Sequence, residues 1–358
     1  MIDMRVAIQS IGISGGFGQG VASLKQALQT GRVEPQTGEV DCNGTVNRFH
    51  CYRAASEGLE TYIPKRALRR IDHYSKLTLY SASLALAEAD LLDTDRTRMG
   101  VVIATGYGAL NTTFDFLDSY LDFGYSCSSP THFSNSVHNS AAAHVSMQFK
   151  LTGPSLTVAQ FELSVPSALL TARQWLAEGR VDQVLFGAVD EYCEVLRYCR
   201  NRFFGKGEQG PTRPFAFENQ SAVVGEGAVF LVLTRDVEKA AYGFIDSVVL
   251  GNHVSSPLQL PAEDFIIAGA DGHRDCGRWY AETIGTQAAA SYSPLYGSFP
   301  AAAGFDLAVA ALTLEAKQLF TAPVEARTAA AAGVEGVGAI SCLKFGSGGD
   351  YGLVRLSA

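Results

Sequence analysis

A glycine-rich stretch near the start of the chain is the first candidate for a chemical site. Residues 12–20 read GISGGFGQG between an apolar segment and an amphipathic one, a place where a loop can cradle phosphate groups. No register gives G-x-G-x-x-G, and no lysine follows to complete a G-x-x-x-x-G-K-S/T loop. Glycine also serves tight turns through its open range of φ. We therefore predict a strand-to-helix turn here and expect no cofactor.

Histidines and cysteines are the next candidates, as metal ligands or redox groups. His138 and His144 have no acidic or cysteine partner at metal-ligand spacing, and the 7 cysteines include no CxxC pair. Cys193 and Cys199 fit buried structural thiols better than a redox pair. We expect core or interface histidines, reduced cysteines and no metal site.

Segments rich in β-branched residues alternate with amphipathic segments, which predicts an α/β protein with covered sheets. The predicted strands include 6–11, 99–104 and 181–187, and the predicted helices include 20–29, 76–89 and 167–178. The segment 167–178 is apolar nearly all round and is followed by Gly179. It should form a helix that lies between layers and ends at that glycine.

A second alternating series begins after residues 234–241. It comprises a strand at 243–250, an alanine-rich helix at 301–320 and strands near 338–341 and 353–356. Residues 328–333 are small and fit a loop or a helix end, and the glycine-rich 346–352 fits a buried hairpin loop. The order of elements predicts two related halves, residues 1–235 and 236–358.

Composition and charge exclude several classes of protein. The 358 residues are 47% hydrophobic and 18% charged, so the chain can bury a sizeable core and is not disordered. No apolar run reaches the roughly 18 residues of a membrane span, and the start lacks the pattern of a secretion signal. A formal net charge of -8 disfavours nucleic acid as a partner. We expect a cytoplasmic protein without a membrane span.

The segment 153–191 reads GPSLTVAQFELSVPSALLTARQWLAEGRVDQVLFGAVDE. It resembles the nucleophile-bearing segment of the β-ketoacyl-acyl-carrier-protein synthases, which runs from a Gly-Pro-Ser strand through a buried helix to a G-x-x-D turn and a G-G-x-E strand end. Further stretches agree with that family: 6–12, 130–144, 213-RPFAF-217 with 225-GEG-227, and 345-FGSGGDYG-352. The resemblance implies a thiolase-like fold with two similar halves in an α-β-α-β-α layered arrangement.

The positions at which this family carries its reactive groups hold other residues here. Glu162 falls on the cysteine, Gly269 on the first histidine, Ser293 on the lysine, Ser298 on the second histidine, and Ser347 on the gating phenylalanine. Condensation needs a thiolate to take the acyl chain, and loss of one general acid-base group or oxyanion donor costs roughly 10² to 10⁴ in rate. The resemblance therefore implies a protein without catalytic residues.

Glu162 can have a structural role at the vacated position. A carboxylate is a poor nucleophile toward a thioester, so the residue does not substitute for the cysteine. Just before the buried helix, it would face unpaired backbone N–H groups and the positive end of the helix dipole, an arrangement worth roughly 0.3 to 2 kcal/mol. We predict such a capping contact.

The stretch 114–125, FDFLDSYLDFGY, combines aromatic side chains with aspartates. One interpretation is packing within a helical core; the other is lining of a channel, because in the resembled family this region lies near the dimer interface and the acyl channel. Pocket or interface candidates are Phe114, Phe116, Tyr120, Phe123, Thr131, His132, Phe133 and His138.

A ketosynthase-like subunit with a replaced nucleophile resembles the chain-length factors of type II polyketide synthases. Such a subunit pairs with an active ketosynthase as a heterodimer and helps to shape the pocket for the growing chain. The factors of aromatic systems carry glutamine at the nucleophile position. Glutamate and the short chain therefore point to a divergent branch, such as one that serves aryl polyenes or other highly reduced chains.

The net charge also bears on the acyl carrier protein, which is acidic. Because this chain has a formal net charge of -8, we expect its ketosynthase partner to bind most of the carrier's surface. The basic cluster of Arg66, Arg69 and Arg70 favours the opposite, direct binding to this chain. Two alternatives remain open. One is a malonyl decarboxylase or unusual acyltransferase that uses Glu162, and the other is a homodimeric acyl-binding protein.

Overall fold

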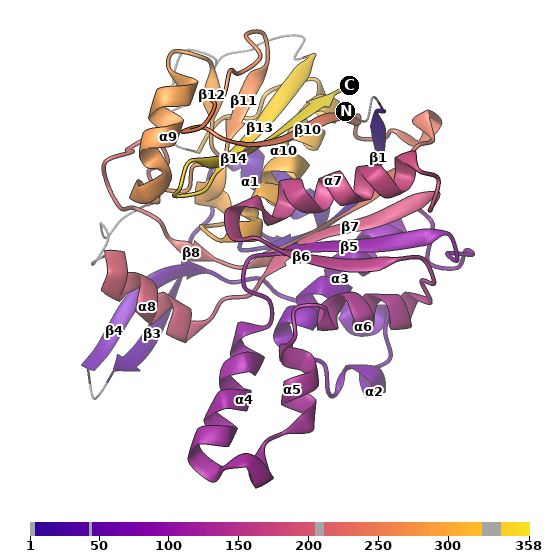
Figure 1. Cartoon of the computed structure of the whole chain (residues 1–358), viewed down its shortest axis with the longest axis vertical. Helices are drawn as coiled ribbons and strands as arrows, with labels where there is room; N and C mark the ends of the chain where they lie inside the picture. The colour runs from indigo at the N-terminus through magenta and orange to yellow at the C-terminus, as the bar shows by residue number, and fades with distance from the viewer. Residues whose placement is uncertain (1–3, 43–44, 205–210, 324–337) are drawn as a thin grey trace.

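The computed structural model describes residues 4–42, 45–204, 211–323 and 338–358 (Figure 1). An 11-stranded sheet has the order β12-β11-β13-β14-β10-β1-β9-β7-β5-β6, with the short β2 paired to β1. Its strands are β1 (Val6–Gly15), β2 (Gly18–Gln19), β5 (Met99–Thr105), β6 (Ser155–Ala159), β7 (Gln183–Asp190), β9 (Gly227–Thr234), β10 (Phe244–Asn252), β11 (Phe265–Ala268), β12 (Ala289–Ala290), β13 (Ala339–Phe345) and β14 (Asp350–Ser357). A 3-stranded sheet contains β3 (Gln36–Cys42), β4 (Thr45–Tyr52) and β8 (Val224–Gly225).

The two ends of the large sheet repeat one arrangement of strands. From the edge inward, β6-β5-β7 and β12-β11-β13 pair in parallel, and β7-β9-β1 and β13-β14-β10 pair antiparallel. The two sets meet where Val6 of β1 faces Ile245 of β10. This repeat confirms the predicted thiolase-like fold with two similar halves. The predicted boundary at 235/236 falls in the link between β9 and β10, and the halves as separate domains stay a prediction.

Helices fill three layers around the two halves of the sheet. The helices are α1 (Gly20–Thr30), α2 (Lys65–Leu68), α3 (His73–Glu88), α4 (Leu110–Phe123), α5 (Pro130–Ser136), α6 (Ser140–Phe149), α7 (Ser164–Ala177), α8 (Glu194–Phe204), α9 (Arg274–Ile284) and α10 (Ala303–Ala316). The central core joins α1, α7 and α10 to both halves, while α3 and α6 cover one outer face and α9 covers the other. None of the described helices is long and apolar enough to cross a membrane.

The local predictions hold for most elements and fail at some ends. The buried helix α7 confirms the apolar pattern of 167–178, and Gly179 follows it with a φ of 67°. The predicted helix 301–320 ends at Ala316, because Lys317 adopts a left-handed conformation that closes it. The glycine-rich stretch 12–20 forms the expected turn into α1, and 346–352 joins β13 to β14 as a hairpin. Residues 328–333 lie outside the described part of the chain.

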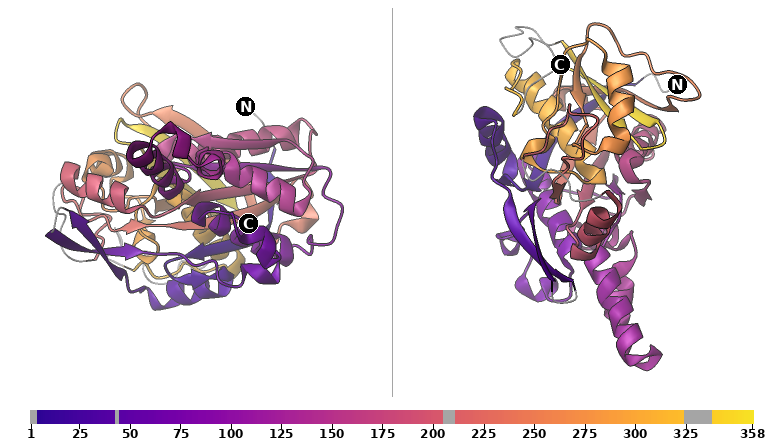
Figure 2. Two further views of the ribbon diagram at one scale, coloured as in Figure 1. Left: turned by 90° about the horizontal axis from the view of Figure 1, so that it is seen from below. Right: turned by 90° about the vertical axis from the view of Figure 1, so that its left-hand side faces the viewer.

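Helices α4 and α5 extend from the layered body as a projecting hairpin (Figures 1 and 2). Within α4, Thr112 is the only buried residue that the structure describes, and Tyr120 and Phe123 are exposed. The interpretation of 114–125 as core packing is therefore wrong. Apolar residues at helical spacing look alike in a core and on an uncovered face, and only neighbouring elements distinguish the two.

The end of β7 holds the loops on which the site and the hairpin depend. The buried Asp190 accepts hydrogen bonds from Gly106 N and Tyr107 N through Oδ1 and from Ala301 N through Oδ2. Glu191 accepts from Asn111 N, at the start of α4, at 2.8 Å. Burial raises the pKa of Asp190 to about 6 and that of Glu191 to about 7. These two carboxyl groups thus tie the loop after β5, the hairpin and the second half together.

We predict that Glu191→Gln flattens the pH dependence of stability. At pH values between 4.5 and about 7, the Glu191 carboxyl keeps its proton in the folded chain but loses it on unfolding. Its contribution to the free energy of unfolding therefore falls as pH rises, by about 3 kcal/mol over this interval. Glutamine still accepts from Asn111 N but does not titrate. Urea unfolding of both proteins across this range measures the difference, and parallel curves would contradict the prediction.

Candidate functional site

A small cavity lies where β6 turns into α7, between the two halves. Its lining residues are Tyr107, Glu162, Arg200, Asp271, His273, Cys276, Ser298, Phe299, Pro300 and Lys344. Glu162 comes from the first half, whereas Asp271, Ser298 and Lys344 come from loops and strands of the second. The structure therefore brings together two of the predicted positions, Glu162 and Ser298, with charged residues that the sequence analysis did not single out.

The turn that carries Glu162 is tightly held. Glu162 lies in one turn of 3-10 helix, η3 (Phe161–Leu163), and Phe161 has a φ of 47°, a conformation that costs a bulky residue of order 1–3 kcal/mol. The buried Ser164 fixes the turn, because its Oγ accepts from Gln160 N at 2.8 Å and donates to Thr105 O at 2.7 Å. The predicted capping contact is wrong: Leu163 precedes α7, and no side chain caps that end.

A buried ion pair occupies the second-half side of the cavity. Lys344 Nζ lies 3.3 Å from Asp271 Oδ2 and donates to Gly269 O at 2.9 Å, and the two side chains are 6% and 13% exposed. Burial raises the pKa of Asp271, but the charge of Lys344, other nearby positive groups and the hydrogen bond from Ser298 together outweigh burial and bring this pKa to about 2. Burial lowers the pKa of Lys344, but Asp271 and further acidic groups around the ammonium together outweigh burial, so this pKa lies above its usual range. Both groups therefore stay charged at neutral pH.

Gly269 makes room for this ion pair. A Cβ on Gly269 would lie 2.9 Å from Lys344 Cδ and 3.0 Å from Asp306 Oδ2, closer than side chains normally approach. Asp306 is itself fixed by the hydroxyl of Tyr296. The stem of Lys344 and the carboxyl of Asp306 thus take the volume that any larger side chain at position 269 would need.

Ser298 and Arg200 continue the polar network. Ser298 Oγ donates to Asp271 Oδ2 at 2.8 Å, and Arg200 of α8 donates to Ser298 Oγ at 3.1 Å. Asp271 therefore lies between two cations and a hydroxyl. Glu162 lines the same cavity, so two acidic and two basic residues are among its lining side chains.

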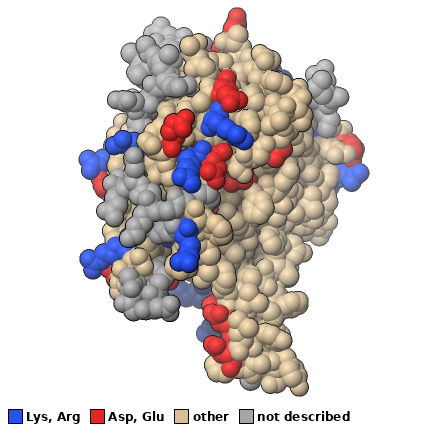
Figure 3. Space-filling view, turned by 60° about the vertical axis from the view of Figure 1, so that its left-hand side comes forward, with Lys and Arg blue, Asp and Glu red and all other residues tan. Residues whose placement is uncertain are grey.

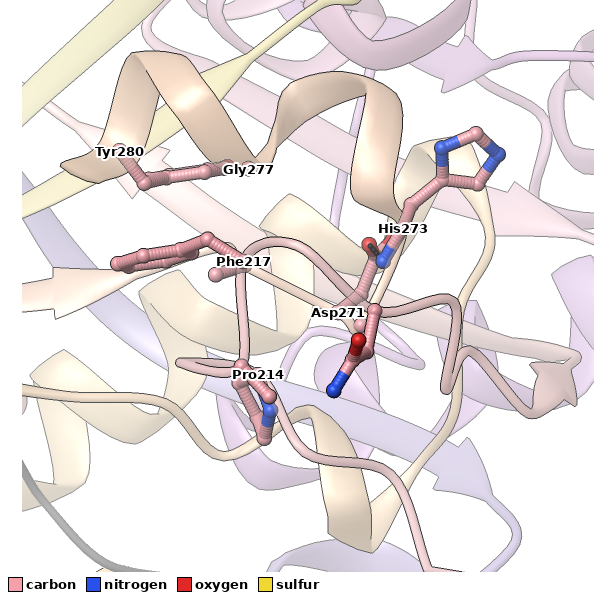
Figure 4. Close-up of a pocket in the computed structure, with 10 residues that line it drawn as sticks. Pro214, Phe217, Asp271, His273, Gly277 and Tyr280 are labelled. Atoms are coloured by element: carbon pink, nitrogen blue, oxygen red, sulfur yellow. Dashed lines mark hydrogen bonds between the residues drawn. The ribbon is translucent and has the colours of Figure 1, made fainter. Parts of the chain in front are cut away.

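An imidazole that the sequence analysis overlooked also lines the cavity. His273 precedes α9, and burial lowers its pKa, which favours the neutral ring. Figure 4 shows a second pocket that Asp271 and His273 also line; there the His273 ring points away from the stacked rings of Phe217 and Tyr280, whose centroids lie 6.5 Å apart. The signal for His273 was present in the sequence, four positions after Gly269, but a gap-free comparison directed attention to position 269 alone.

The cavity has little capacity for condensation chemistry. The free space among its side chains is about 10 Å³, which is close to the lower limit for one water molecule. Its one thiol, Cys276, is buried, and burial raises the pKa of this thiol to about 12. A thiol in that state is protonated and is not a nucleophile. The charges of Lys344 and Asp271 in this cavity are paired with each other.

The other replaced positions lie outside this cavity. Ser293 is buried and donates to Ala270 O at 2.9 Å, behind the loop that carries Asp271. Ser347 lies in the β13–β14 hairpin and lines a separate open groove of about 480 Å³ with Phe217, Glu218, Arg274, Asp275 and Arg278. The backbone oxygen of Ser347 accepts from Trp279 Nε1 at 3.0 Å. The structure thus separates the gate position from Glu162.

All the pocket or interface candidates lie on or beside the projecting hairpin, and none lines the Glu162 cavity. Phe114, Phe116, Tyr120 and Phe123 are on α4, Thr131, His132 and Phe133 are on α5, and His138 lies between α5 and α6. The rings of Phe116 and Phe133 pack the two helices together, with centroids 5.5 Å apart. Figure 3 shows acidic side chains gathered along one side of the hairpin.

The other histidines and the cysteines that the sequence analysis considered were predicted to have structural roles. His144 Nε2 lies 3.4 Å from Asn135 Oδ1, and His138 is exposed beside Gly108. The free cysteines that the structure describes are Cys51, Cys193, Cys199, Cys276 and Cys342; Cys199 is half-buried and the others are buried. In the described ranges, no group of 3 or more His, Cys, Asp or Glu residues could hold a metal ion.

Comparison with known proteins agrees with this geometry. The family described as "Beta-ketoacyl synthase, N-terminal domain" matches residues 4–239. The malonyl-ACP decarboxylase PksF of Bacillus subtilis is 25% identical over 240 residues, which cover 64% of this chain and 57% of that protein. The chain thus spans little more than half the length of this curated relative.

Two solved structures share the fold over nearly the whole chain. A chain of the ishigamide ketosynthase/chain length factor has a TM-score of 0.81 at 18% identity, with 99% of both chains covered. A chain of the ketosynthase ApeO in complex with its chain length factor ApeC, from Xenorhabdus doucetiae, has a TM-score of 0.79 at 15% identity and covers 99% of this chain and 98% of that one. The fold defines a thiolase-like ketosynthase class. The chain belongs to the β-ketoacyl synthase family.

We predict that Gly269→His destabilises the chain by about 3 kcal/mol, because the new side chain overpacks the buried stem of Lys344. In Gly269→His/Lys344→Ser, the smaller side chain relieves that overpacking. The double variant should therefore lose clearly less free energy of unfolding than the two single variants lose in sum. Urea unfolding of the four proteins completes the cycle. Strict additivity would mean that positions 269 and 344 do not compete for one volume.

Proposed function

We propose that this chain is a non-catalytic, ketosynthase-like subunit, a chain-length factor that pairs with an active ketosynthase in the cytoplasm and shapes its acyl pocket. The observation that carries the proposal is the filled cavity. Glu162 stands at the start of the buried helix, and the Lys344–Asp271 pair takes the space beside Gly269. A subunit that keeps the scaffold of a condensing enzyme but not its reactive groups can still act through its surface, by binding a partner subunit.

The exposed edge of the large sheet supports pairing with a second subunit. Strand β6 pairs with β5 on one side and ends the described sheet order on the other. Unprotected edge strands are templates for pairing with another chain. Leu156 on β6 and Met147 on α6 are exposed next to this edge. We call the exposed apolar side chains of β6, α6 and the hairpin the partner face.

The projecting hairpin is the part of the partner face suited to shaping a pocket. Tyr120 and Phe123 on α4 and Phe133 on α5 are exposed, although aromatic side chains of this size normally pack against other groups. Inserted beside a partner's acyl channel, they would limit the length of chain that fits. Leu117 and Leu121 add apolar surface, whereas Asp115, Asp118 and Asp122 form a separate acidic stripe.

The acyl carrier protein would bind mainly through the ketosynthase partner. Arg66, Arg69 and Arg70 are exposed on and after α2, and no ion pair is described for them. This basic cluster is the surface that would contact an acidic carrier if the chain contributes to docking. Service to aryl polyenes or other highly reduced chains is the narrower form of the proposal, and it rests on Glu162 at the nucleophile position and on the short chain.

A malonyl decarboxylase is the second candidate. It is favoured by the similarity to PksF and by the presence of His273 in the same cavity as Glu162. Against it stand the small volume of the cavity and the charges of Lys344 and Asp271, which are engaged with each other. A homodimeric acyl-binding protein is the third candidate and would use the same partner face.

We predict that the purified chain forms no β-ketoacyl product from acyl- and malonyl-carrier proteins, and that Glu162→Cys does not restore activity. The variant supplies a thiol, but Gly269 and Ser298 still lack imidazoles to stabilise the developing charges. Mass spectrometry of the carrier-bound products and of released CO₂ provides the measurement. Malonyl decarboxylation by the lone chain, lost in His273→Ala, would support the second candidate instead.

The matched control is a ketosynthase encoded by a gene next to that of this chain and chosen for an intact Cys, His, His set, called here the neighbouring ketosynthase; it is assayed alone and with this chain. Under the proposal, condensation requires the ketosynthase, and the product length changes when this chain is present. Size-exclusion chromatography with light scattering distinguishes the assemblies. A stable homodimer that retains an acyl ligand and ignores the ketosynthase would favour the acyl-binding alternative.

A further inference from the structure

The strained residue of the site turn is also one of its most exposed. Phe161 has a φ of 47°, and its side chain is 57% exposed. A left-handed conformation is unfavourable for a bulky side chain, and glycine would adopt it without a steric penalty. Within the chain, the Phe161 ring makes an edge-on contact with Tyr107, at 5.7 Å between centroids. This one contact leaves more than half of the side chain uncovered.

The surroundings hold Phe161 in this position firmly. Ser164, which is fully buried, bonds both Gln160 N and Thr105 O and so pins the turn to β5. Gln160 Oε1 in turn accepts from Ser167 Oγ at 2.6 Å. A strained conformation persists where its neighbours determine it in this way, and such positions gather at functional sites. The turn therefore presents the phenyl ring outward in a fixed orientation.

Phe161 extends the partner face defined above. It lies two residues after the end of β6, where Ala159, Gln160 and Phe161 are consecutive exposed positions, and Leu156 is exposed earlier on the same strand. Rigid aromatic side chains with few rotatable bonds are the typical anchors of protein interfaces, since little entropy is lost when they bind. The ring is thus both pre-positioned and adjacent to the unpaired edge of the sheet.

We infer that Phe161 is an anchor residue for the partner subunit: the strained turn inserts its ring into an apolar pocket of the ketosynthase, next to the strand that pairs with β6. The inference rests on the proposed function, because it takes the active ketosynthase as the occupant of this surface. The turn that holds the nucleophile in a condensing enzyme would here serve recognition. The ring would also cover Tyr107 and Glu162 from the partner side.

The test measures association of this chain with the neighbouring ketosynthase. Phe161→Gly removes the ring and relieves the backbone strain, so the isolated variant should unfold at a urea concentration no lower than that of Phe161→Ala. Both variants should bind the ketosynthase at least tenfold more weakly than the unaltered chain. Val237→Ala is the matched control: Val237 is 58% exposed on the link after β9, and β5 and β7 separate β9 from β6. This control should bind normally.

A second measurement does not depend on the folding of the glycine and alanine variants. Benzoylphenylalanine placed at position 161 should crosslink to the ketosynthase on illumination, whereas the same group at position 237 should not. If the unaltered chain forms no complex with the ketosynthase, the proposed function and the anchor role both fail. If the complex forms but Phe161→Gly binds as tightly as the unaltered chain, or position 161 does not crosslink, the anchor role alone is overturned.

Discussion

The buried ion pair between Lys344 and Asp271 is the interaction on which this account depends. It exists because Gly269 leaves space for the lysine stem, and Ser298 and Arg200 complete its hydrogen bonds. Breaking one partner of such a pair leaves an unpaired buried charge, which typically costs about 3–5 kcal/mol. The reactive groups of a condensing enzyme therefore cannot return one at a time. The pair itself lies within the second half, and Arg200 of the first half connects to it through Ser298.

Buried hydrogen bonds outside this pair hold the scaffold of the site. Asp190 still ties the loop after β5 to the second half, and Ser164 still fixes the turn before α7. The most unusual surfaces of the chain lie on the outside, at the free edge of β6 and on the hairpin of α4 and α5. The same packing thus holds both of these outer surfaces in place, and the proposed pairing with a ketosynthase would use them.

Much of the fold followed from the sequence, because the order of apolar segments and the burial of α7 are local properties. The exposure of α4 did not, since its aromatic spacing suits a covered or an uncovered helix equally. The ion pair was also missed, because Lys344 and Asp271 lie 73 positions apart and only folding joins them. Lys344, an isolated charge in the apolar stretch AISCLKF, was the one local signal. The capping role expected of Glu162 failed because the extra turn η3 places Leu163 next to α7.

Intact-protein mass spectrometry after incubation with an acyl thioester tests the central claim most directly. A filled site without an activated nucleophile should leave the mass of this chain unchanged, while an active ketosynthase in the same mixture gains the acyl group. An acyl adduct on this chain, mapped to Glu162 or Cys276, would contradict the account, because it would show that substrate enters the cavity and reacts there.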